Sequence, residues 1–164
     1  MLLAARQKFI VGKEDPTSDF ARLVEANPRD SVAAEFLART QLRAGKISDF
    51  EATFGRAQRE NAVNAQLAVL AVKRLVQLDK MPEALQLSKE AAHKAPDDPE
   101  VAETWLILAE ASHKNAETAA AAEWFLRMAP DDLSAHKKFA EALARLGQTQ
   151  AAALQRAIAD ATAF

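Results

Sequence analysis

The sequence lacks cysteine altogether, and this absence excludes several kinds of site. Without thiols the chain can form no disulfide framework, no thiolate nucleophile and no zinc site with cysteine ligands. It also has no tyrosine and only 4 glycines, whereas Ala and Leu supply much of its apolar content. Because Ala and Leu have the best intrinsic helix propensities, this composition predicts an all-α fold and disfavours a fold dominated by sheets.

The chain also lacks a strong net charge of either sign. Its formal charge at pH 7 is -2, and its isoelectric point is near 5.9. A strongly basic chain would be attracted to phosphate backbones and anionic membranes, and this sequence has no such overall attraction. We therefore expect no nucleic-acid partner.

No long hydrophobic run opens the chain. Arg6, Gln7 and Lys8 interrupt the apolar residues at positions 1–11. This leaves neither a secretory h-region nor a segment long enough to span a bilayer. We expect no direct membrane insertion and a cytoplasmic location for this sequence. The location stays open if the chain is excised from a longer exported protein.

What the chain does have is size and repetition. It has 164 residues, of which 49% are hydrophobic, enough for one domain with a substantial core. Pro28, Pro96 and Pro130 have similar local contexts and are 68 and 34 residues apart, and Ala62 occupies the missing place in the series. Two residues beyond each of these four places stands a strong N-cap residue, and the four caps predict four helix starts. They are Asp30, Asn64, Asp98 and Asp132.

Each 34-residue unit divides into two amphipathic stretches, which predicts a helix-turn-helix hairpin. The breaks between the stretches fall at residues 44–46, 78–80, 113–115 and 146–148. The predicted helices cover residues 1–13, 16–26, 31–44, 47–60, 64–78, 81–94, 98–112, 116–128, 132–146 and 148–162. With no linker visible, we expect a single domain over residues 1–164. Its parts are a partial hairpin at 1–30 and repeats at 31–64, 65–98, 99–132 and 133–164.

This pattern resembles the tetratricopeptide repeat (TPR) family, whose period is 34 residues. The resemblance covers nearly the whole chain and implies a right-handed superhelical solenoid of antiparallel helix hairpins. When each repeat is numbered from the residue after its cap, the family has small or apolar residues at the eighth, twentieth and twenty-seventh places. The corresponding residues here are Ala38, Val72, Leu106 and Ala140, then Phe50, Ala84, Thr118 and Ala152, then Ala57, Ala91, Phe125 and Ala159.

The third repeat departs most from this pattern, because Leu106, Thr118 and Phe125 are larger than the family's usual residues. A second register slides the second helix by two residues. Ala120 and Trp124 then take the small and aromatic places, and the break near His113 lengthens. The sequence leaves both registers open, and both give the same fold class.

The resemblance also implies a function. Stacked hairpins leave a curved surface, and in the family the first helix of each hairpin lines its concave side. The chain is then a scaffold or adaptor that binds a peptide or protein segment in this groove. The candidate partner-binding residues are Arg39, Arg43, Lys73, Val76, Gln77, Glu103, Ile107 and Glu110.

The cations of this set lie in the N-terminal half and the acids in the third repeat. We expect a partner segment, extended or helical, whose own charge reverses along its length. The alternative is an ordinary solvated helix face with i,i+4 ion pairs. The clamp with which some family members bind chaperone tails is missing, because Arg39 and Leu70 stand at two of its places.

Residues that suggest other functions have structural explanations. The acid pairs Asp97-Asp98 and Asp131-Asp132 repeat at one helix-start position, which favours capping over acid-base chemistry or metal binding. Trp105, Trp124 and Phe125 allow a recognition patch, but their helical spacing favours core. The three histidines show no short two-ligand spacing, and no nucleophile elbow or phosphate loop occurs. We predict no enzyme activity, no cofactor and no metal site. The histidines are His93, His113 and His136.

A second function stays open from the sequence. The apolar residues Leu2, Leu3, Phe9, Ile10 and Val11 at one end suggest a structural spacer or a self-assembling segment of a larger TPR protein. In that case the chain forms homo-oligomers through its terminal hairpins. The Ala-rich style resembles bacterial TPR proteins, several of which serve in envelope or exopolysaccharide assembly.

Overall fold

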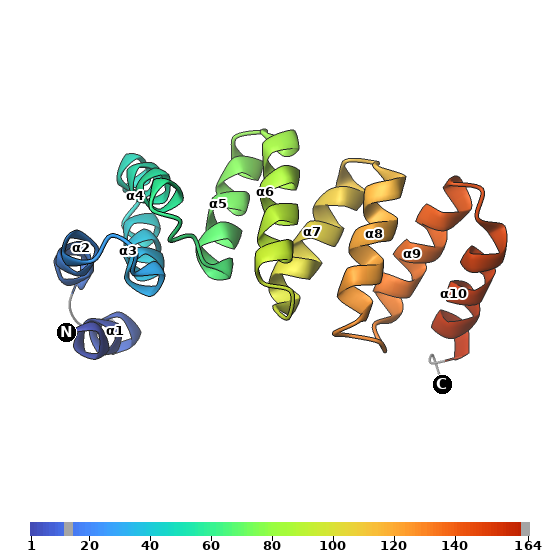
Figure 1. Ribbon diagram of the computed structural model, residues 1–164, viewed down its shortest axis with the longest axis horizontal. Helices are drawn as coiled ribbons and strands as arrows, with labels where there is room; N and C mark the ends of the chain where they lie inside the picture. The colour runs from blue at the N-terminus through green and yellow to red at the C-terminus, as the bar shows by residue number, and fades with distance from the viewer. Residues whose placement is uncertain (12–14, 162–164) are drawn as a thin grey trace. The chain divides into compact units, whose positions relative to one another are not determined.

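A computed structural model describes residues 1–11 and 15–161, and every regular element within these ranges is an α-helix (Figure 1). The all-α prediction is therefore confirmed. Each predicted helix is present, and where both the predicted and the observed end are described they differ by at most two residues. The helices are α1 (Leu2–Val11), α2 (Thr17–Ala26), α3 (Ser31–Arg43), α4 (Ile47–Arg59), α5 (Ala65–Gln77), α6 (Met81–Lys94), α7 (Pro99–Ala111), α8 (Asn115–Leu126), α9 (Leu133–Arg145) and α10 (Thr149–Ala161).

The chain divides into two compact units, Met1–Ala71 (unit 1) and Val72–Phe164 (unit 2), whose boundary falls within α5. In unit 1, α2 packs on α3 and α3 on α4, while α1 contacts both α2 and α3. In unit 2, α6 through α10 each pack on the next helix along the chain. This sequential packing is the one expected of helix hairpins. The division into one partial hairpin and four repeats stays a prediction.

The four predicted N-caps are confirmed. Asp30 and Asp98 each accept two backbone N–H bonds from the first turn of their helix, and Asn64 and Asp132 each accept one from the third helical residue. These bonds measure between 2.8 and 3.2 Å. The side chains thus satisfy N–H groups that have no partner inside the helix.

The first helices α3, α5, α7 and α9 end in one type of turn. Gly45, Asp79, His113 and Gly147, at 34-residue spacing, have positive φ angles between 54° and 77°. The residue after each donates its N–H to a carbonyl five positions back, at 2.8 to 3.2 Å. This is the bond pattern of a Schellman cap, which requires a left-handed residue.

The same turn decides the register of the third repeat. α8 begins at Asn115, so the break around His113 has the same length as the breaks in the other repeats. Thr118 and Phe125 are buried, whereas Ala120 is exposed. The register that slides the second helix by two residues is therefore wrong, because the left-handed turn fixes where α8 starts.

The positions at which the family has small or apolar residues make up much of the core. All twelve residues at the eighth, twentieth and twenty-seventh places are buried. Trp105 and Phe125 are buried and Trp124 is half-buried, which confirms the core interpretation for the first two. The rings of Trp105 and Trp124 lie 6.4 Å apart, in an edge-to-face arrangement that joins α7 to α8.

Candidate functional site

In unit 1, the candidate residue Arg39 belongs to a polar network. Its Nε donates to Glu35 Oε1 at 2.8 Å and its Nη2 donates to Gln66 Oε1 at 2.9 Å. Glu35 is buried, and its second oxygen accepts a 2.9 Å bond from the Nδ2 of Asn64, the residue that caps α5. The Arg39 guanidinium is therefore neutralised and connects α3 to the start of α5.

Arg43 has a different environment. Its guanidinium lies 4.8 Å from the centre of the Phe9 ring of α1, a cation–π contact. The side chain is exposed, and no ion pair of Arg43 is found among residues 1–11 and 15–161. Arg43 thus carries a positive charge that no carboxylate neutralises in the described structure.

In unit 2, two of the candidate charges form ion pairs between first helices. Lys73 of α5 lies 3.6 Å from a carboxylate oxygen of Glu100 on α7. Glu110 of α7 bonds to the ammonium of Lys138 on α9. Successive first helices of unit 2 are therefore connected by ion pairs along the side on which the candidate residues lie.

Exposed apolar side chains lie on the same side. Ile107 on α7 is 50% exposed and Val76 on α5 is 41% exposed. Glu103, one turn before Ile107, is also exposed and makes no ion pair with any residue that the structure describes. Gln77 is exposed next to Val76. We call the exposed residues of α5 from Val72 onward, of α7 and of α9 the first-helix face of unit 2.

The structure thus separates the predicted charges into two classes. Arg39, Lys73 and Glu110 have partners within the chain, whereas Arg43 and Glu103 have no ion pair among the described residues. Arg39 and Lys73 stand 27 residues before their partners Gln66 and Glu100. Glu110 stands 28 residues before its partner Lys138. These separations join neighbouring repeats, whereas the i,i+4 pairs considered from the sequence lie within one helix, so the sequence did not indicate these pairs or Lys138.

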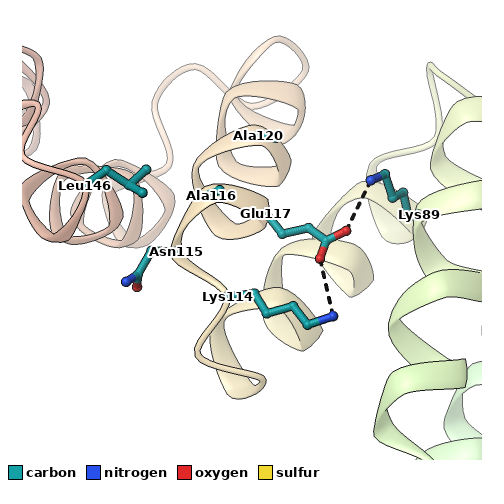
Figure 2. Close-up of a pocket in the computed structure, with 7 residues that line it drawn as sticks. All are labelled: Lys89, Lys114, Asn115, Ala116, Glu117, Ala120 and Leu146. Carbon is teal, nitrogen blue, oxygen red and sulfur yellow. Dashed lines mark hydrogen bonds and ion pairs between the residues drawn. The ribbon is translucent and has the colours of Figure 1, made fainter.

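A separate open cleft of about 530 Å³ lies in unit 2 at the start of α8 (Figure 2). Figure 2 shows the Glu117 carboxylate between two ammonium groups, 3.1 Å from Lys89 and 3.8 Å from Lys114. Ala116, Ala120, Asn115 and Leu146 complete the lining. None of the predicted candidate residues lines this cleft. Its lysines already share one carboxylate, so it offers little free charge to a ligand.

The three histidines lie in different surroundings, and His113 is the left-handed residue of the turn after α7. His93 packs against Trp105 and Trp124 with tilted rings, at 5.6 and 5.0 Å between ring centres. His136 is buried between the side chain of Gln155 and the carbonyl of Pro130. Among residues 1–11 and 15–161, no three His, Cys, Asp or Glu side chains gather in a way that would hold a metal ion. The described helices also include none with the length and apolar character that crossing a membrane requires.

Comparison with known proteins identifies the fold. No sequence-family model and no curated protein matches the chain. Among solved structures, MamA is similar with a TM-score of 0.70 and 13% identity over 96% of this chain and 93% of that one. YrrB, a TPR protein with an unusual peptide-binding site, gives 0.69 and 15% over 97% and 82%. MamA from Desulfovibrio magneticus RS-1 gives 0.65 and 11% over 97% and 90%. The chain therefore has the fold of the tetratricopeptide repeat proteins.

Proposed function

We propose that the chain is a protein-interaction scaffold, and that the exposed faces of its first helices hold a segment of another protein. The exposure of Val76 and Ile107 carries this proposal, because two large apolar side chains on successive first helices lie open to water. YrrB, which has the same fold, is named for a peptide-binding site and supports the proposal. Since one fold serves many functions, the proposal depends on these side chains more than on the fold.

The proposed contacts are the eight candidate residues, considered separately in each unit. In unit 2, Val76 and Ile107 supply apolar contact, Gln77 supplies an amide, and Glu103 supplies a free carboxylate. Lys73 and Glu110 frame this surface with their ion pairs. In unit 1, Arg43 supplies a free cation, and Arg39 holds the network beside it. The pattern of an apolar centre with a polar rim is typical of protein-binding surfaces.

The test begins with selection of binding peptides from a random displayed library on the whole chain. A selected peptide is then titrated, by fluorescence anisotropy, against the wild type and the variants Ile107→Asp and Leu154→Asp. Leu154 on α10 is 60% exposed and lies outside the proposed surface, so it is the matched control.

We expect Ile107→Asp to weaken peptide binding about tenfold or more, because it removes apolar contact and would place a charge in the interface. Leu154→Asp should leave the affinity unchanged. Equal affinities for all three proteins would contradict the proposal. Ile107 is half exposed, so its replacement should preserve the fold, and thermal melting checks this point.

A second candidate function is self-assembly, and α1 carries the observation that favours it. Leu3 and Ile10 are 80% and 76% exposed, and their separation of seven residues places them on one face of the helix. Another side chain of α1, Phe9, makes an edge-on contact with Phe36 of α3, at 5.4 Å between ring centres. An exposed apolar face of this kind can be covered by a second copy of the chain.

Sedimentation equilibrium at several concentrations tests this second candidate. If α1 mediates assembly, the apparent mass of the wild type should rise with concentration. The double variant Leu3→Asp with Ile10→Asp should remain monomeric. A wild type that stays monomeric over the whole range would contradict self-assembly through α1, and the scaffold proposal would be unaffected.

A further inference from the structure

We propose that the first-helix face of unit 2 selects a partner segment with a fixed order of side chains. Counted from α5 toward α9, the segment has an apolar residue, then a basic residue opposite Glu103, then an acidic residue opposite Lys137. This inference rests on the proposed scaffold function. It adds the chemistry of the partner and the direction in which the partner lies.

The ion pairs of α7 define the direction in which Glu103 and Ile107 point. Glu100 reaches back to Lys73 on α5, and Glu110 reaches forward to Lys138 on α9. A helix turns by about 100° per residue, so Ile107, Glu103 and Glu110 lie about 20°, 60° and 80° from Glu100 in the same sense. Glu103 and Ile107 therefore lie between the directions of the two neighbouring first helices, on the side where both are exposed.

Most charges on this face are neutralised within the chain. Besides the two pairs that join the helices, Glu141 and Arg145 of α9 form an i,i+4 pair at 3.6 Å. Glu103 and Lys137 are different. Both are exposed, and neither forms an ion pair with any of the residues described here. They stand 34 residues apart, at the same place in successive repeats, with opposite charges.

A segment that crosses the first helices from α5 to α9 meets these features in a fixed order. It first meets the exposed side chains of Val76 and Ile107, then the free carboxylate of Glu103, then the free ammonium of Lys137. The basic residue of the segment therefore comes before its acidic residue when the segment is followed from α5 toward α9.

The opposite order is disfavoured for an electrostatic reason. A segment of reversed polarity places an acid next to Glu103 and a base next to Lys137, and the juxtaposition of like charges at an interface opposes binding. The ion pairs within the chain carry little net charge, so they interact weakly with a segment of either charge order. The two free charges thus decide the order of the basic and acidic residues, while Val76 and Ile107 place the apolar residue on the side of the basic one.

Display selection with three forms of the whole chain tests this inference. The forms are the wild type, the swap Glu103→Lys with Lys137→Glu, and a control swap, Glu90→Lys with Lys94→Glu. The control makes the same two changes on exposed residues of α6, and it keeps the net charge constant. Thermal melting checks that all three forms are folded.

The wild type and the control should enrich peptides in which the basic residue lies between the apolar residue and the acidic residue. Read from the N-terminus of the peptide, the order is apolar, basic, acidic or its reverse, because either chain direction of the peptide places these side chains correctly. The Glu103/Lys137 swap should enrich peptides in which the apolar residue is next to the acidic side. A wild-type peptide should bind the swap about tenfold more weakly, and its charge-reversed version should restore the affinity.

Two results would overturn the inference or its basis, and they are distinguishable. If all three forms select peptides with the same charge order, or with none, the inference fails while the scaffold proposal stands. If no form selects any peptide, the scaffold proposal itself fails.

Discussion

Gly45, Asp79, His113 and Gly147 hold the same left-handed backbone turn, yet only two of the four are glycine. An L-residue in this conformation brings its Cβ too close to the following carbonyl oxygen, and glycine avoids this strain. Asp tolerates the conformation better than most residues. At the residue scale the same backbone conformation therefore recurs in all four turns, and the stability of each turn depends on which residue stands at its left-handed position.

Substitution at these turns should change stability in a predictable direction. Gly45→Ala should lower the free energy of unfolding by about 1 kcal/mol. A Cβ at Gly45 meets no atom within 4 Å, so the loss comes from the backbone alone. His113→Gly should raise the stability by up to about 1 kcal/mol, because it relieves the same strain. Urea denaturation measures both changes.

Gly55 provides the matched control, because it lies within α4, outside any left-handed turn. A Cβ there makes only an ordinary contact, 3.6 Å from the side chain of Arg59. Gly55→Ala should therefore stabilise the chain by about 0.8–1 kcal/mol through helix propensity. If Gly45→Ala and Gly55→Ala shifted stability in the same direction, the account of the turns would be wrong.

Trp105 is the second test at the residue scale. It is 2% exposed and packs against Trp124 and His93. Trp105→Ala should cost about 3–5 kcal/mol of stability, because it leaves a large cavity between α6, α7 and α8. Trp105→Phe should cost much less, since it keeps an aromatic ring and removes a buried indole N–H for which the described part of the chain offers no acceptor. An unchanged urea midpoint for Trp105→Ala would contradict its place in the core.

At the scale of the element, each first helix from α3 to α9 combines a polar cap at its start with a left-handed turn at its end. Both features stand at 34-residue spacing, and both satisfy backbone groups that the helix itself leaves open. The caps were predictable from the sequence because Asp and Asn are strong N-cap residues. The turns were predicted only as breaks, because Asp79 and His113 are not glycine.

The acid pair Asp97-Asp98 tests the capping role. Asp98 accepts two backbone N–H bonds at the start of α7, at 3.0 and 3.2 Å, while its neighbour Asp97 is exposed. Asp98→Ala should therefore lower the stability by about 1 kcal/mol, and Asp97→Ala should change it little. Thermal or urea denaturation compares the two variants. Equal losses would mean that charge at this corner matters more than the cap.

Ion pairs between different helices are the feature that could not be predicted from the sequence. The candidate residues follow from their places in single repeats, and their role in binding stays a prediction. The sequence did not reveal that Lys73 pairs with Glu100 or that Glu110 pairs with Lys138. Such pairs depend on how neighbouring hairpins pack and on the rotamers of long side chains. Periodicity within one helix contains neither kind of information.

At the scale of the whole molecule, three independent features follow one period: the caps, the left-handed turns, and the buried places within each repeat. Agreement between local signals and burial is typical of sequences that specify one fold. For this reason the fold could be predicted almost completely. The proposed binding surface is predictable from the sequence only as a set of places in the repeats. Which of its charges lack an ion-pair partner among the described residues depends on the pairs that form between helices.

Site-specific photo-crosslinking tests the central claim most directly. A photoreactive amino acid is placed at Ile107 in one protein and at Leu154 in another, and each is irradiated with a peptide selected on the wild type. The account predicts a covalent adduct from position 107 and none from position 154. An adduct from position 154 without one from position 107 would contradict the claim that the first-helix face holds the partner.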